Sequence, residues 1–220
     1  DDESRCLAEL NEKHMEFVFF SADTNQNKEN KEKAREYVMQ LLNSAENECL
    51  ICDPYFKKED FEKYIFFMEK LDVKVRIINS EKQLGNISAP DSEDYLLKLN
   101  DCINYYNRKV GREVAECRSL TKNLSIHDRF IIIDDCGWLI GSSLNEFGNR
   151  ASSICKIPQG SLEYMRKNFE RWWNDTENSE SLDGYIQRKV KLNASQEGKL
   201  LKHITHLTRV LNSLKSQLAK

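Results

Sequence analysis

The stretch HDRFIIIDDCGWLIGSSLN, residues 127–145, joins a hydrophobic hairpin pattern to an unusual set of polar side chains. Two apolar runs flank the turn-forming residues 134–137, which predicts a β-hairpin. Because side chains alternate between the two faces of a strand, we expect His127 and Arg129 to lie next to each other on one face. The returning strand is expected to bring small polar residues close to them: Gly141, Ser142 and Asn145.

A histidine beside a fixed positive charge suits phosphodiester chemistry. The imidazole can attack phosphorus or move a proton, and the cation can hold the non-bridging phosphate oxygens. The alternative interpretation is a core hairpin with one buried, hydrogen-bonded histidine. The fixed spacing of all six polar or small positions favours the phosphate site, because a structural histidine does not require it.

This spacing resembles the signature of the phospholipase D superfamily: His-x-Lys, four residues, Asp, six residues, Gly-Ser, two residues, Asn. Every gap is reproduced here, by His127, Arg129, Asp134, Gly141, Ser142 and Asn145. Arg129 replaces the usual lysine. Arginine keeps the positive charge and adds a two-pronged donor for phosphate oxygens, but its reach and geometry differ.

The resemblance implies a role for each residue of the site. His127 would be the nucleophile in one subunit and the general acid in the other, and Arg129 and Asn145 would hold the non-bridging oxygens. Ser142 would support the phosphate or the imidazole, and Ser143 would contact the substrate. Asp134 points away from His127 by strand alternation, so we expect a structural role in the turn.

The family mechanism needs two histidines, each from its own copy of the motif. The other histidines here are His14, His203 and His206, and none has Lys or Arg two residues on. A complete site would therefore need two chains, with His127 of each facing the other across a two-fold axis. The resemblance thus predicts a homodimer.

A second departure concerns the acid that orients the histidine in many members of the family. It lies roughly ten residues beyond the Gly-Ser element, yet residues 151–157 contain no carboxylate, and Glu146 comes too early. Either Ser152 or Ser153 substitutes weakly for this acid, or the site is impaired.

Strand and helix patterns alternate along the chain. We expect strands at residues 15–20, 49–55, 73–79, 113–118 and 151–157, besides the hairpin. We expect helices at residues 28–45, 59–71, 92–109 and 161–174, and a loop at 83–91. This alternation predicts an α/β fold with a largely parallel mixed sheet and helices on both faces. A phospholipase D-like catalytic domain is expected over residues 1–178 and a C-terminal helical tail over 179–220.

Ligands collect at the carboxyl ends of strands in such sheets, where Tyr55 follows a hydrophobic strand and Pro54. Tyr55 is predicted to line the substrate cleft. The alternative is an aromatic ring packed under the loop.

The composition of the chain bears on its membrane association, the state of its cysteines and its capacity to bind a metal. The 220 residues, 40% of them hydrophobic, contain no apolar run of about 18 residues, so we expect no membrane span and no membrane partner. Seven cysteines without framework spacing indicate reduced thiols in a cytoplasmic protein. Cys49 and Cys52 have metal-like spacing, but no second pair or nearby histidine completes a set, so we expect neither metal nor cofactor. The first residue is not methionine and the last residues continue a helical pattern, as expected of a piece of a larger protein.

The tail carries a heptad pattern of apolar residues, which predicts a helical partner. Its members are Leu200, Ile204, Leu207, Leu211, Leu214 and Leu218. Residues 181–220 have a net charge of +6, which leaves −9 for residues 1–180. The basic helix either follows a nucleic-acid backbone or packs on its own domain or on a dimer mate.

The resemblance implies a metal-independent phosphodiesterase, and we expect a nuclease that cuts DNA or RNA as a homodimer through a phosphohistidine intermediate. A short chain with one motif resembles the dimeric nuclease branch more than the two-motif phospholipases. The alternative is a catalytically reduced module that binds nucleic acid or anionic lipid as a scaffold. A third hypothesis is lipid hydrolysis or phosphoinositide binding, which a basic amphipathic tail would permit.

Overall fold

The computed structural model describes residues 17–21, 27–84, 94–121, 124 and 126–218. In this part of the chain, the strands form one open sheet in the order β1-β7-β6-β5-β2-β3-β4-β8. Their bounds are β1 Phe17–Phe20, β2 Glu48–Cys52, β3 Lys74–Ser80, β4 Ala115–Leu120, β5 Phe130–Ile133, β6 Cys136–Ile140, β7 Ser152–Lys156 and β8 Ser179–Ser181.

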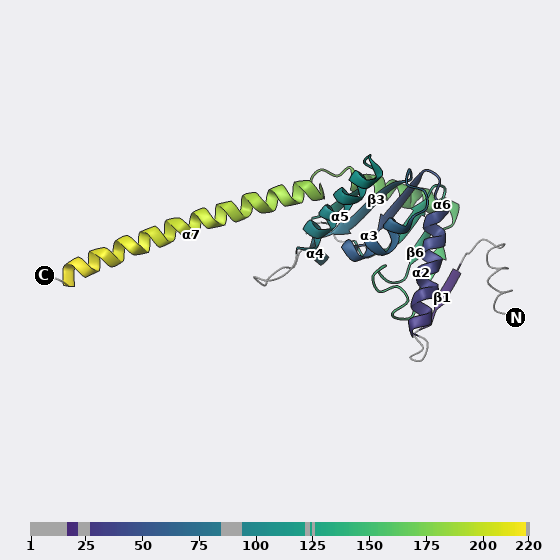
Figure 1. Cartoon of the computed structure of the whole chain (residues 1–220), viewed down its shortest axis with the longest axis horizontal. Helices are drawn as coiled ribbons and strands as arrows, with labels where there is room; N and C mark the ends of the chain where they lie inside the picture. Colours follow the sequence, from purple (N-terminus) through teal and green to yellow (C-terminus); the bar gives the residue numbers. More distant parts are fainter. Residues whose placement is uncertain (1–16, 22–26, 85–93, 122–123, 125, 219–220) are drawn as a thin grey trace. The chain divides into compact units, whose positions relative to one another are not determined.

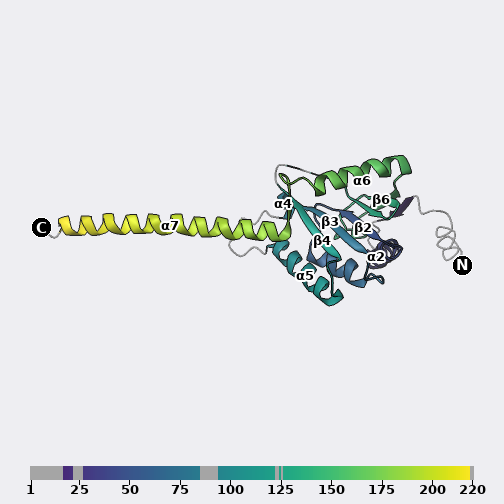
Figure 2. The ribbon, with the colours of Figure 1, turned by 90° about the horizontal axis from the view of Figure 1, so that it is seen from above.

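Helices cover both faces of this sheet, as the sequence predicts (Figures 1 and 2). Figure 2 shows α6 on one face and α2 and α5 on the other. The helix bounds are α2 Asn27–Asn43, α3 Lys58–Tyr64, the 3-10 turn η1 Ile65–Phe67, α4 Glu81–Leu84, α5 Tyr95–Val110, α6 Gln159–Trp173 and α7 Leu182–Leu218. The expected α/β class is therefore confirmed.

The expectation of a largely parallel sheet is wrong. Among the described strands, β2, β3 and β4 run parallel, whereas the other five pairings are antiparallel. The reason lies in the connections: helices link β2 to β3 and β3 to β4, which are neighbours in the sheet, whereas α2 and α6 link strands that are not neighbours. The hairpin reverses direction in two residues, Asp134 and Asp135, and short reversals of this kind produce antiparallel neighbours.

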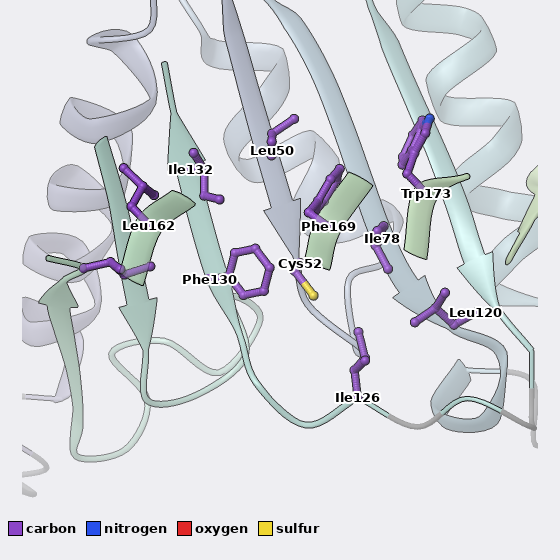
Figure 3. Packing of buried hydrophobic residues seen from close by; sticks show 11 residues of the cluster. Leu50, Cys52, Ile78, Leu120, Ile126, Phe130, Ile132, Leu162, Phe169 and Trp173 are labelled. Carbon is purple, nitrogen blue, oxygen red and sulfur yellow. The ribbon is translucent and has the colours of Figure 1, made fainter. Parts of the chain in front are cut away.

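The hydrophobic core beneath α6 holds the motif hairpin in place (Figure 3). Phe130 and Ile132 of β5 point into it, and Leu162 and Phe169 of α6 lie near them. The ring centroids of Phe130 and Phe169 are 6.4 Å apart in an edge-to-face arrangement. Since Ile131 and Ile133 are buried on the opposite face, all four residues of β5 are enclosed.

The predicted elements agree with the structure in type, with shifted ends. Residues 15 and 16 of the first predicted strand, and most of the loop predicted at residues 83–91, lie outside the described residues. The short edge strand β8 was not predicted, because three polar residues carry no strand pattern. The chain divides into two compact units, Asp1–Leu182 and Asp183–Lys220. None of the described helices is both long and apolar enough to cross a membrane.

Candidate active site

The motif reaches its position through the pairing of three strands. Cys52 at the end of β2 pairs with Phe130 at the start of β5, and Phe130 pairs in turn with Leu139 of β6. The residues just beyond these pairs therefore meet at one edge of the sheet. Figure 3 shows Cys52 and Phe130 side by side there. Asp53 and Arg129 follow from this register as cross-strand neighbours.

An open pocket of about 420 Å³ lies at this edge. Its lining contains six residues that the sequence singles out, namely Tyr55, Arg129, Gly141, Ser142, Ser143 and Asn145. Glu146 and Arg150 complete the lining. The alternative of a Tyr55 ring packed away under its loop is therefore wrong, since the half-buried ring forms part of the pocket wall.

His127 is placed differently from the expectation. Strand β5 begins at Phe130, so His127 lies in the connecting segment before the strand, and it is exposed to solvent. It is not among the residues that line the pocket, although Arg129, two residues on, is. An exposed imidazole excludes the alternative of a buried core histidine.

Arg129 is held between an aromatic ring and a carboxylate. Its guanidinium carbon lies 5.3 Å from the centroid of the Tyr55 ring, which is cation–π distance. Its Nε lies 3.9 Å from Oδ1 of Asp53, and among the described residues this buried nitrogen has no hydrogen-bond partner. Because the side chain is 23% exposed, part of its positive charge faces the pocket.

Asp53 is the site residue that sequence reasoning missed. It is 1% exposed, and its two carboxylate oxygens accept hydrogen bonds from two backbone N–H groups. Leu144 donates to Oδ2 at 2.7 Å and Tyr55 donates to Oδ1 at 3.0 Å. Burial raises the pKa of Asp53 to about 6, although these two hydrogen bonds and Arg129 act to lower it. An acid directly after a buried strand was the available signal.

The segment after β6 is shaped by close backbone packing. Gly141 N–H donates to the Ser153 carbonyl at 2.8 Å, and a Cβ on Gly141 would lie 3.2 Å from the Ser153 nitrogen. The Ser143 hydroxyl donates to Oδ1 of Asn145, which fixes the amide orientation. The buried Ser142 hydroxyl has no hydrogen-bond partner among the described residues, although Ser142 lines the pocket.

Asp134 has the expected structural role. It begins the hairpin turn with φ +45°, and its carboxylate accepts three hydrogen bonds, from the backbone N–H groups of residues 46, 47 and 48, at 2.7 to 3.0 Å. Burial acts to raise its pKa, but the three donors outweigh this effect and lower the pKa below its usual value. Asp134 stands at the opposite end of β5 from the pocket, so it supports the sheet.

The serines discussed as replacements for the missing acid do not line the pocket. Ser152 is buried, and Ser153 is half-buried. Glu146 and Arg150 line it instead, and both are exposed. The sequence pattern placed Glu146 too early for the orienting acid and gave no signal for Arg150, because the position of both depends on the fold of the segment after β6.

A metal site is not formed among the described residues, where no group of three or more His, Cys, Asp or Glu side chains could hold an ion. Cys49 and Cys52, the pair with metal-like spacing, are both buried within β2. Burial raises the pKa of both thiols, which disfavours the thiolate that a metal requires.

Comparisons with known proteins place this site in a family. The sequence profile described as "Cardiolipin synthase, PLD-like domain" matches residues 38–173, more than half of the chain. No curated protein matches it. NucT from Helicobacter pylori has a similar structure, at 15% identity and a TM-score of 0.50, over 75% of this chain and 98% of NucT.

Two longer proteins were also matched by the structural comparison. Phosphatidylserine synthase from Haemophilus influenzae is 16% identical with a TM-score of 0.52, over 78% of this chain and 40% of the synthase. TrmBL2, an archaeal chromatin protein, is 16% identical with a TM-score of 0.42, and the chain spans 53% of its length. The profile match, together with the spaced His-Arg-Asp-Gly-Ser-Asn motif, shows that the chain belongs to the PLD-like domain family of the phospholipase D superfamily.

Proposed function

We propose that this chain is a metal-independent phosphodiesterase, a nuclease that works as a homodimer through a phosphohistidine intermediate. The observation that carries the proposal is one open pocket that Arg129, Ser142 and Asn145 all line. The exposed His127 comes two positions before Arg129 in the chain. A cation, an amide and a hydroxyl without a partner among the described residues are suitable donors for the oxygens of a phosphodiester. Arg150 on the pocket wall adds a further positive charge.

The proposed reaction has two steps. His127 of one subunit attacks phosphorus, so that a P–N bond forms and the P–O bond to the leaving group breaks. The second subunit's His127 gives its proton to the leaving oxygen. In the second step this imidazole takes a proton from water, and the resulting hydroxide displaces the first histidine from phosphorus. Arg129 and Asn145 hold the non-bridging oxygens throughout.

Nucleic acid is the proposed substrate because the C-terminal part of the chain has few acidic residues, so that residues 181–220 have a net charge of +6. The runner-up is a binding module that keeps the phosphate pocket without turnover. The specific observation that favours it is the absence of a carboxylate from β7, Ser152–Lys156. In that case the chain would hold nucleic acid or anionic lipid as a scaffold.

A cleavage assay in excess EDTA tests the proposal. The substrates are single- and double-stranded DNA, RNA, bis(4-nitrophenyl) phosphate and vesicles that contain anionic phospholipid. We expect cleavage of at least one nucleic acid, and loss of cleavage in His127→Ala with the fold retained by circular dichroism. His206→Ala, which removes an exposed histidine outside the motif, is the matched control and should stay active. Binding without cleavage of any substrate would favour the scaffold function, and cleavage of lipid alone would replace the nuclease proposal.

A further inference from the structure

A row of polar side chains crosses the sheet at the edge where the pocket lies. Cys52 pairs with both Phe130 and Ile78, and Ser119 pairs with Asn79. The next positions on the four strands, Arg129, Asp53, Asn79 and Ser119, are therefore neighbours that point to the same face. Asp53 is the only acid of this row, and it is buried next to its only cation.

Asp53 joins two segments that form the pocket. Its Oδ1 accepts from the N–H of Tyr55, whose ring stacks against Arg129, and its Oδ2 accepts from the N–H of Leu144, between Ser143 and Asn145. Both oxygens have further acceptor capacity, and Nε of Arg129 is 3.9 Å from Oδ1. A displacement of the Arg129 side chain by roughly 1 Å would bring Nε into hydrogen-bond range of Oδ1.

We propose that Asp53 is a positioning residue that holds Nε of Arg129, so that the two terminal nitrogens of the guanidinium face the phosphate. This inference rests on the proposed phosphate site. It also explains the departure at Arg129 in chemical terms. Lysine has a single terminal ammonium and no second donor along its side chain. In arginine, Nε can donate a hydrogen bond to one acceptor while the two terminal nitrogens donate to the phosphate. The buried Asp53 carboxylate is the acceptor for Nε, and its negative charge partly offsets the positive charge of Arg129 in the pocket.

Phosphate binding measures the effect without requiring turnover. The probe is inorganic phosphate, titrated by calorimetry into the full chain. For Asp53→Asn, we expect the dissociation constant for phosphate to rise about tenfold, since one charge-assisted contact is lost. If the chain cleaves substrate, KM should rise by more than kcat falls. Asp60→Asn is the matched control, because Asp60 is equally buried at 1% exposure but bonds to the N–H of Lys57 and lines no part of the pocket.

A double-mutant cycle separates a positioning role from a general structural one. In the Arg129→Lys background there is no Nε to hold, so Asp53→Asn should change phosphate affinity by less than about twofold. An equal loss in both backgrounds would overturn the proposal, because Asp53 would then act through the loops alone. Asp60→Asn should have the same small effect in both backgrounds.

An experiment on the unmutated side chains covers the case in which Asp53→Asn does not fold. In the wild-type chain, the Nε–H signal of Arg129 in ¹⁵N NMR should exchange more slowly with water when phosphate is added. Arg129→Lys identifies the signal. Exchange as fast as that of a free arginine would contradict the inference. A chain that shows these couplings but cleaves nothing would remove the proposed enzyme activity and leave the inference standing, whereas a chain that binds no phosphate would overturn both.

Discussion

Asp134 illustrates how one residue of a catalytic motif can serve the fold. Its carboxylate satisfies three backbone N–H groups at the start of β2, and its backbone adopts a φ of +45°. Asp134→Ala should lower the free energy of unfolding by about 2–3 kcal/mol, because donors lose their acceptor and alanine tolerates positive φ poorly. Activity per folded molecule should be unchanged. Urea denaturation measures the effect, and Asp135→Ala, at the exposed neighbouring position, is the control. An equal loss in both variants would refute the capping role.

Asp60 gives the stability a predictable pH dependence. Burial raises the pKa of this carboxyl to about 7, against the opposing N–H of Lys57. An acid whose pKa is higher in the folded state binds protons more tightly there, so its contribution to stability is greatest below pH 4 and is lost as the pH rises towards 7. Asp60→Asn imitates the protonated acid. The stability of the wild type relative to this variant should therefore fall between pH 4 and 7, by about 4 kcal/mol at most, at about 1.4 kcal/mol per pKa unit. A difference that stays constant over this range, in denaturation at a series of pH values, would show that Asp60 titrates normally.

At the scale of elements, the contact between α6 and β6 depends on a glycine. A Cβ on Gly137 would lie 2.5 Å from Cδ1 of Leu162 and 3.2 Å from Cδ1 of Ile157. Gly137→Ala should therefore lower the free energy of unfolding by about 1–3 kcal/mol through overpacking. Gly160 in α6 has nothing within 4 Å of its Cβ position, so Gly160→Ala should stabilise the protein, by up to about 1 kcal/mol. Thermal unfolding compares the two, and the reverse order would mean that α6 sits farther from β6.

The motif hairpin and the helices were predictable because their patterns are local. Alternation and turn residues predicted the reversal at Asp134, and the apolar stripes predicted α2, α5 and α6. The direction of the sheet was not predictable in the same way. Strand periodicity does not show which neighbour a strand pairs with. The antiparallel pairings of β1 with β7, β2 with β5 and β4 with β8 join distant parts of the chain.

In the candidate site, too, residues with a local sequence pattern were predictable and residues brought together by strand pairing were not. Spacing along the chain predicted Arg129, Ser142 and Asn145 together, and they do line one pocket. Asp53 is 76 positions before Arg129, and only the register of β2 against β5 brings the two together. No local pattern contains that register, because it follows from which strands pair.

At the scale of the whole molecule, α7 is a long helix with an apolar seam. Leu200, Ile204 and Leu207 are all at least half exposed on it. Deletion of residues 195–220 should weaken self-association or nucleic-acid binding but leave the proposed catalytic dimer in place, because the seam would be a second, independent contact. Light scattering and gel-shift assays of both chains measure these effects. A truncated chain with unchanged association and unchanged binding would remove the proposed role of the seam.

The central claim is that one active site uses His127 from two chains. Wild-type and His127→Ala chains can be refolded together in varied proportions at constant total concentration, and cleavage measured in EDTA. If both histidines are required, only dimers of two wild-type chains are active, so activity falls with the square of the wild-type fraction, and an equal mixture keeps about one quarter of it. If activity falls in direct proportion, so that the equal mixture keeps about half, each chain works alone and the two-histidine account is contradicted.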